Sequence, residues 1–75
     1  IDPDLLTAWI NLTSACTMAG RDDQAVDAAR QAVTLEPDSG MARNNLAVAL
    51  YFRGDYQEAA EQMEILEHSF FFFLN

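Results

Sequence analysis

The 75-residue chain contains no lysine, and its permanently charged cations are four arginines set against twelve aspartates and glutamates. The net charge of −8 argues against a nucleic-acid partner, because phosphate binding depends on clustered lysine and arginine side chains. A single cysteine excludes an internal disulfide and leaves the redox compartment undecided. No apolar run approaches the roughly 20 residues that a membrane-spanning helix needs.

Histidine and cysteine, which often build catalytic and metal sites, occur only once each. His68 has no ligand partner three or four positions away, so the sequence predicts no metal site. Ser14, Ser39 and Ser69 lack the base that would activate a nucleophile, and no glycine-rich phosphate loop is present. Cys16 lies on an apolar stripe and is interpreted as a structural thiol. We therefore expect neither catalysis nor a cofactor.

The apolar fraction of 51% is typical of a folded chain, but a core of this size is marginal by itself. The chain opens on Ile1 without an initiator methionine, and we expect it to be a segment of a longer protein. A partner, neighbouring repeats or self-association should therefore contribute to its stability.

What the sequence does contain is an internal repeat with an offset of 34 residues. Eight residues recur at that offset, namely Pro3, Asp4, Ala8, Asn11, Leu12, Ala15, Gly20 and Ala25. A fixed period in this range indicates a stacked supersecondary unit, and such units build surfaces for partners.

Apolar residues follow the 3.6-residue period of amphipathic helices, which predicts an all-α fold. We expect helices over residues 5–19, 22–35, 40–53 and from about 56 onward. The buried face of the first helix should comprise Leu5, Ala8, Trp9, Leu12, Ala15, Cys16 and Ala19, and that of the last Ala59, Ala60, Met63 and Leu66.

Polar and small residues mark the expected helix ends. Gly20 and Gly54 should end the first and third helices in a left-handed conformation. Asp55 and Glu58 should form a reciprocal capping box at the start of the last helix. The third helix should be capped by residue 38 or 39, an aspartate or a serine.

The spacing of Trp9, Leu12, Gly20, Ala25, Ala32 and Pro37 resembles one tetratricopeptide repeat, and Leu46, Gly54, Asp55, Tyr56 and Ala59 resemble most of a second. The resemblance implies a helical-hairpin solenoid of four antiparallel helices with right-handed superhelical stacking. It divides the chain into a tail of a preceding repeat or linker (1–5), repeat one (6–39), repeat two (40–69) and a phenylalanine-rich end (70–75). The second repeat departs from the pattern at Arg43, Leu66 and Phe71.

The resemblance also implies a concave groove lined by the first and third helices, which would bind a protein or peptide segment. The groove residues would be Thr7, Ile10, Asn11, Ser14, Thr17, Met18, Met41, Asn44, Asn45, Val48, Tyr51 and Phe52. The apolar side chains among them would anchor a bound peptide, and the asparagine amides would donate to and accept from its backbone. Alternatively, a neighbouring helix covers Val48, Tyr51 and Phe52. The carboxylate clamp of some family members is rejected, because its lysines are missing.

The four adjacent aromatics Phe70, Phe71, Phe72 and Phe73 cannot all face one side of a helix. They are interpreted as an end cap, as an interface with a second chain or with the rest of a longer protein, or as an edge left by truncation. The interface interpretation predicts a homodimer. The alternative function is accordingly a structural module whose repeats and phenylalanine-rich end mediate self-association or support an adjoining domain.

Overall fold

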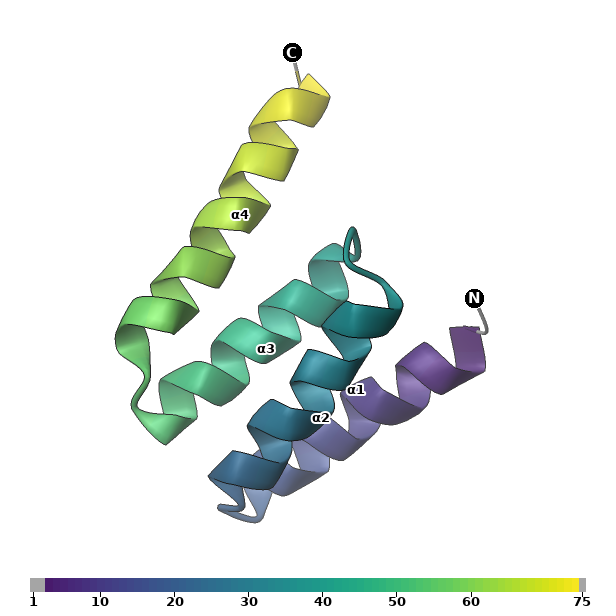
Figure 1. The fold of residues 1–75 in the computed structure, drawn as a ribbon, viewed down its shortest axis with the longest axis vertical. Coiled ribbons are helices and arrows are strands. Elements are labelled where there is room, and N and C mark those ends of the chain that lie inside the picture. Colours follow the sequence, from purple (N-terminus) through teal and green to yellow (C-terminus); the bar gives the residue numbers. More distant parts are fainter. Residues whose placement is uncertain (1–2, 75) are drawn as a thin grey trace.

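The computed structural model describes the backbone of residues 3–74 and the side chains of residues 4–65. Within this range the chain forms helices α1 (Pro3–Met18), α2 (Asp22–Leu35), α3 (Gly40–Arg53) and α4 (Tyr56–Leu74), with no strand (Figure 1). The predicted all-α class and the predicted bounds of α2 and α3 are confirmed. No helix in the described part of the chain is both long and apolar enough to cross a bilayer.

Two equivalent turns make the helical hairpins α1–α2 and α3–α4. Gly20 and Gly54 have φ angles of 74° and 94°, a left-handed conformation that side chains with a Cβ rarely adopt. At the first turn the Arg21 N–H donates to the Cys16 carbonyl (2.8 Å), and at the second the Asp55 N–H donates to Leu50 (2.9 Å). This six-to-one hydrogen bond is the Schellman ending of a helix.

The helix starts differ from one another. The Ser39 hydroxyl caps α3 by accepting from the Ala42 N–H at 3.2 Å, whereas Arg21 gives α2 no side-chain cap. The predicted capping box of α4 is wrong. The Asp55 N–H, which was expected to donate to Glu58, donates to the Leu50 carbonyl, and the Glu58 carboxylate accepts from Arg30 instead.

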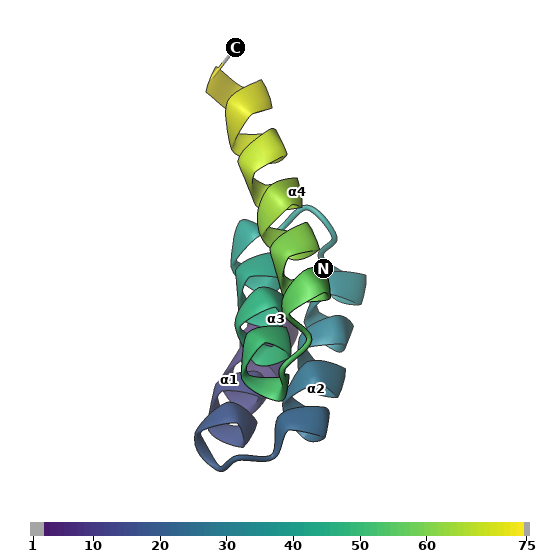
Figure 2. The same ribbon diagram turned by 90° about the vertical axis from the view of Figure 1, so that its left-hand side faces the viewer.

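Helix α3 lies in the middle of the molecule and packs against each of the other three helices (Figures 1 and 2). The continuous core consists of Cys16, Ala25, Val26, Ala29, Leu46, Ala49, Leu50 and Ala59, with Val33 packed against it. Alanines on the facing sides of α2 and α3 allow a close approach of the two helix axes, while Leu50 and Val26 fill the space between them.

The predicted buried faces of α1 and α4 are only partly correct. Cys16 and Ala59 are buried, but Leu5 and Leu12 are 44% and 46% exposed and Met63 is 44% exposed. Ala8, Ala15, Ala19 and Ala60 are exposed as well, and Leu66 lies outside the described side chains. The physical reason is position, because α1 and α4 are the outer helices of the stack and each lacks a neighbour on one side. Instead of Leu12, α1 buries Thr13, whose hydroxyl donates to the Trp9 carbonyl at 2.8 Å.

Candidate functional site

The predicted groove residues of α1 are mainly open to solvent. Thr7, Asn11, Ser14 and Met18 are exposed, and Met18 has 88% of its surface accessible. Ile10 is half-buried. A methionine with that exposure gains little from the fold of this chain alone, so it is available for contact with another molecule.

On α3 the predicted groove residues are exposed with one exception. Met41, Tyr51 and Phe52 are 68%, 59% and 59% exposed. Val48 and Asn44 are exposed too, whereas the side chain of Asn45 is half-buried.

Asn45 links the two helices that carry these residues. Its Nδ2 donates to the Ile10 carbonyl oxygen at 3.2 Å, which fixes α3 beside α1. The amide therefore has a structural partner, and a substitution of Asn45 would change helix packing as well as any binding role.

The aromatic end of α3 continues onto α4, which the sequence did not predict. Tyr51 makes edge-on contacts with Phe52 (centroids 5.8 Å apart) and with Tyr56 at the start of α4 (5.2 Å). Beside them lies an apolar hollow of about 410 Å³, lined by Ala47, Val48, Tyr51, Phe52, Tyr56, Ala59, Ala60 and Met63. Ala60 and Met63, predicted as core, instead form the α4 wall of this hollow. An apolar concavity of this kind is a common form of binding site.

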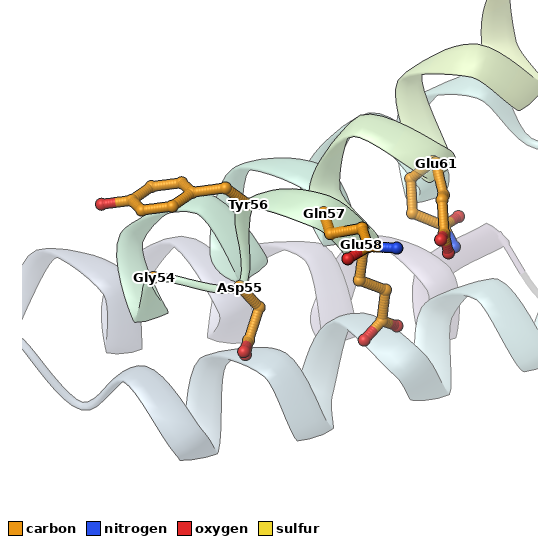
Figure 3. Close-up of a pocket in the computed structure, with 7 residues that line it drawn as sticks. Gly54, Asp55, Tyr56, Gln57, Glu58 and Glu61 are labelled. Atoms are coloured by element: carbon orange, nitrogen blue, oxygen red, sulfur yellow. The ribbon is translucent and has the colours of Figure 1, made fainter.

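Two of the arginines connect the hairpins electrostatically. Arg30 of α2 makes two hydrogen bonds to the Glu58 carboxylate of α4, at 2.8 and 3.1 Å. Arg53 pairs with Asp55 and, at 3.2 Å, with Asp23. In Figure 3 the carboxylates of Asp55 and Glu58 point from the start of α4 toward α2, and the Tyr56 ring points away from them.

These contacts shift the pKa of the groups involved. The hydrogen bonds from Arg30 lower the pKa of Glu58, and the same contact raises the pKa of Arg30. The hydrogen bond to Asp55 raises the pKa of Arg53. These cations are therefore engaged with carboxylates of their own chain, which leaves a predominantly acidic surface.

Within the described side chains, no group of three or more His, Cys, Asp or Glu residues is placed to hold a metal ion. Cys16 is buried in the core, as predicted for a structural thiol. The side chains of Phe70, Phe71, Phe72 and Phe73 lie outside the described residues, so the oligomer interface assigned to them stays a prediction.

Comparison with known proteins gives three relatives that match most of this chain. It is 36% identical over 61 residues, 81% of its length, to the small glutamine-rich tetratricopeptide repeat-containing protein 2 of Mycosarcoma maydis. It is 38% and 35% identical over 63 residues, 84% of its length, to the peroxisomal targeting signal receptors of Candida albicans and Eremothecium gossypii. The chain spans only 17%, 11% and 11% of these proteins. No family model matches it, and no solved structure is a significant match.

Proposed function

We propose that this chain, which carries tetratricopeptide-type repeats, is a non-catalytic scaffold. It would bind a protein segment along α1 and α3. The observation that supports this most is the exposure of large apolar side chains on these two helices. Met18, Met41 and Phe52 are 88%, 68% and 59% exposed. Phe52 also lines one apolar hollow with Val48 and Tyr51, and a contiguous exposed apolar surface is typical of a contact site.

The chemistry of the surface suits a peptide segment. The apolar hollow of about 410 Å³ between the C-terminal half of α3 and the N-terminal half of α4 would hold an apolar anchor side chain. Asn11 and Asn44, which are both exposed, would each donate to and accept from a bound backbone. One N–H of the Asn45 amide already donates to the Ile10 carbonyl, so only its other N–H and its oxygen could bond a peptide.

The negative charge of the chain limits which protein segments it could bind. With a net charge of −8, the chain favours basic or apolar segments and disfavours nucleic acid. Two of the relatives are named as receptors for a targeting signal, and a receptor role fits a groove that receives a peptide.

The test is a peptide selected from a random display library on the wild-type chain, with its affinity measured by fluorescence anisotropy. Because Met41 and Phe52 would contribute apolar contact, Met41→Ser and Phe52→Ser should each weaken binding by about tenfold, which corresponds to about 1.4 kcal/mol. The matched control is Ile65→Ser, which removes an apolar side chain 40% exposed on α4.

Thermal melting by circular dichroism establishes that each variant is folded. Unchanged affinity in both groove variants, or an equal loss in the control, would contradict the proposal. Asn45 is unsuitable for this test, because its hydrogen bond to Ile10 couples binding to helix packing.

A further inference from the structure

Most charged side chains of this chain lie outside the two helices that carry the proposed groove. Helix α1 contains one of them, Asp4 in its first turn, and α3 contains two, Arg43 and Arg53. The remaining acids and arginines lie in α2, in α4, in the turns or before α1. None of the predicted groove residues is charged, although the chain as a whole has a net charge of −8.

The two arginines of α3 are half-buried, and both are held by partners outside the groove residues. Arg43 donates to a backbone carbonyl of the turn before α3 at 2.8 Å and to the Gln62 side chain of α4 at 3.0 Å. Arg53 pairs with Asp55 before α4 and, at 3.2 Å, with Asp23 in the first turn of α2. Over the described side chains, α1 and α3 therefore offer no unengaged cation to a segment that crosses them.

The uncharged surface is unfavourable for a charged ligand side chain. On α3 the exposed side chains Met41, Val48 and Phe52 are apolar and would remove water from whatever they contact. A charge that loses its hydration without gaining an opposite charge costs far more free energy than a neutral polar group does. The part of a ligand that contacts α1 and α3 should therefore be neutral.

The two helices differ in polarity at equivalent positions of the repeat. At three of these positions hydroxyl side chains of α1 correspond to apolar or aromatic side chains of α3, namely Thr7, Ser14 and Thr17 on α1 and Met41, Val48 and Tyr51 on α3. At one further position both are apolar, with Met18 on α1 and Phe52 on α3. A segment that crosses both helices therefore meets a mainly polar side on α1 and a mainly apolar side on α3.

The amides of Asn11 and Asn44 indicate the backbone conformation of the ligand. Both side chains are exposed, and neither makes a hydrogen bond within the part of the chain whose side chains are described. Each amide can donate and accept at the same time. An extended segment leaves its N–H and C=O groups free for such partners, whereas a helix uses most of them internally. The amides therefore favour an extended ligand.

We propose that the segment bound along α1 and α3 is extended and uncharged over the stretch that contacts them, with hydroxyl or amide side chains over α1 and apolar ones over α3. This inference rests on the proposed function and specifies its ligand. A free C-terminal carboxylate has no place in the contact, because Arg43 and Arg53 are already engaged. The acids of α2 and α4 lie outside the contact and keep the chain soluble without adding affinity.

The test uses the peptide selected on the wild-type chain, synthesised with an acetylated N-terminus and an amidated C-terminus. Its affinity, measured by fluorescence anisotropy, should change less than about twofold between about 50 and about 500 mM NaCl, because the contact contains no ion pair for salt to screen. Each peptide residue is then replaced in turn by glutamate and by lysine. At the positions that matter, both replacements should weaken binding by about tenfold. A peptide with a free C-terminal carboxylate should bind no more tightly than the amidated one.

A variant of the chain tests the same point from the other side. Asn44→Lys places a cation on the exposed surface of α3, so it should weaken the uncharged peptide and restore the binding of at least one glutamate-substituted peptide. The matched control is Glu61→Gln, which changes the net charge by the same amount at an exposed residue of α4 outside the predicted groove and should leave both affinities unchanged. Thermal melting by circular dichroism establishes that both variants are folded.

The inference is overturned if added salt weakens binding by tenfold, if a lysine or glutamate in the peptide strengthens binding to the wild type, or if the free carboxylate does. Its failure differs from failure of the proposed function. When Met41→Ser and Phe52→Ser weaken binding but salt does so too, the groove stands and its uncharged ligand is wrong. When neither serine variant weakens binding, the groove itself is wrong.

Discussion

Single residues decide where the hairpins turn. Gly54 has a φ of 94°, and a Cβ added there would meet no atom within 4 Å. The requirement for glycine is therefore conformational and not a matter of space, because only the left-handed backbone penalises a side chain.

We expect Gly54→Ala to lower the free energy of unfolding by about 1–2 kcal/mol, measured by urea denaturation. Gly40→Ala is the matched control, because Gly40 is the exposed first residue of α3 and is not among the glycines with positive φ. It should raise stability by about 0.4–1 kcal/mol through the lower entropy of the unfolded chain. Equal losses in both variants would contradict the conformational explanation.

The ion pair between Arg30 and Glu58 is a second residue-scale feature. Both side chains are more than a third exposed, so we expect Glu58→Gln to lower stability by only about 0.5 kcal/mol at pH 7. The folded-state pKa of Glu58 is lowered by Arg30, so this contribution is present above the unfolded pKa of about 4.3 and disappears as the pH falls through the lowered value.

Urea denaturation of Glu58→Gln and wild type between pH 7 and pH 2.5 measures this dependence. The difference between the two proteins should shrink toward zero at the acidic end. Glu64→Gln, an exposed acid in the middle of α4, serves as the control for loss of one charge. A difference that stays constant with pH would show that Glu58 acts through packing and not through its charge.

At the scale of helices, the repeat sets identical residues in different surroundings. Leu46 and Leu12 occupy the same position in the two hairpins, yet they are 2% and 46% exposed. We expect Leu46→Ala to lower the free energy of unfolding by about 3 kcal/mol through a cavity, and Leu12→Ala by less than about 1 kcal/mol. Denaturation at a concentration where the chain is monomeric compares them. Similar losses would mean that α3 does not dock as described.

The sequence predicts those features of the helices that depend on neighbouring residues in the chain, and it misses those that depend on distant ones. The bounds of α2 and α3 follow from local periodicity, a glycine stop and a serine cap, and they match. The buried faces of α1 and α4 cannot be predicted in this way, because an apolar residue such as Leu12 or Met63 is buried only where another helix covers it. The Arg30–Glu58 pair spans 28 positions, and no local pattern indicates it.

For the whole molecule, the 34-residue repeat determines how the two helices that carry the proposed groove are arranged. It sets α1 beside α3, and both helices carry exposed apolar side chains, Met18 on α1 and Met41 and Phe52 on α3. The groove residues stay a prediction from the resemblance. The α4 wall of the hollow was not predicted, because Ala60 and Met63 had been assigned to the core.

The most direct measurement is chemical-shift mapping by NMR of a library-selected peptide titrated into the isotope-labelled wild-type chain. Binding along α1 and α3 predicts the largest shifts at the Met18 and Met41 methyl groups and at the Phe52 amide, with little change at Thr34 or Glu64. Shifts confined to α2 and the outer side of α4, with the Met18 and Met41 methyl groups unmoved, would contradict the proposed groove.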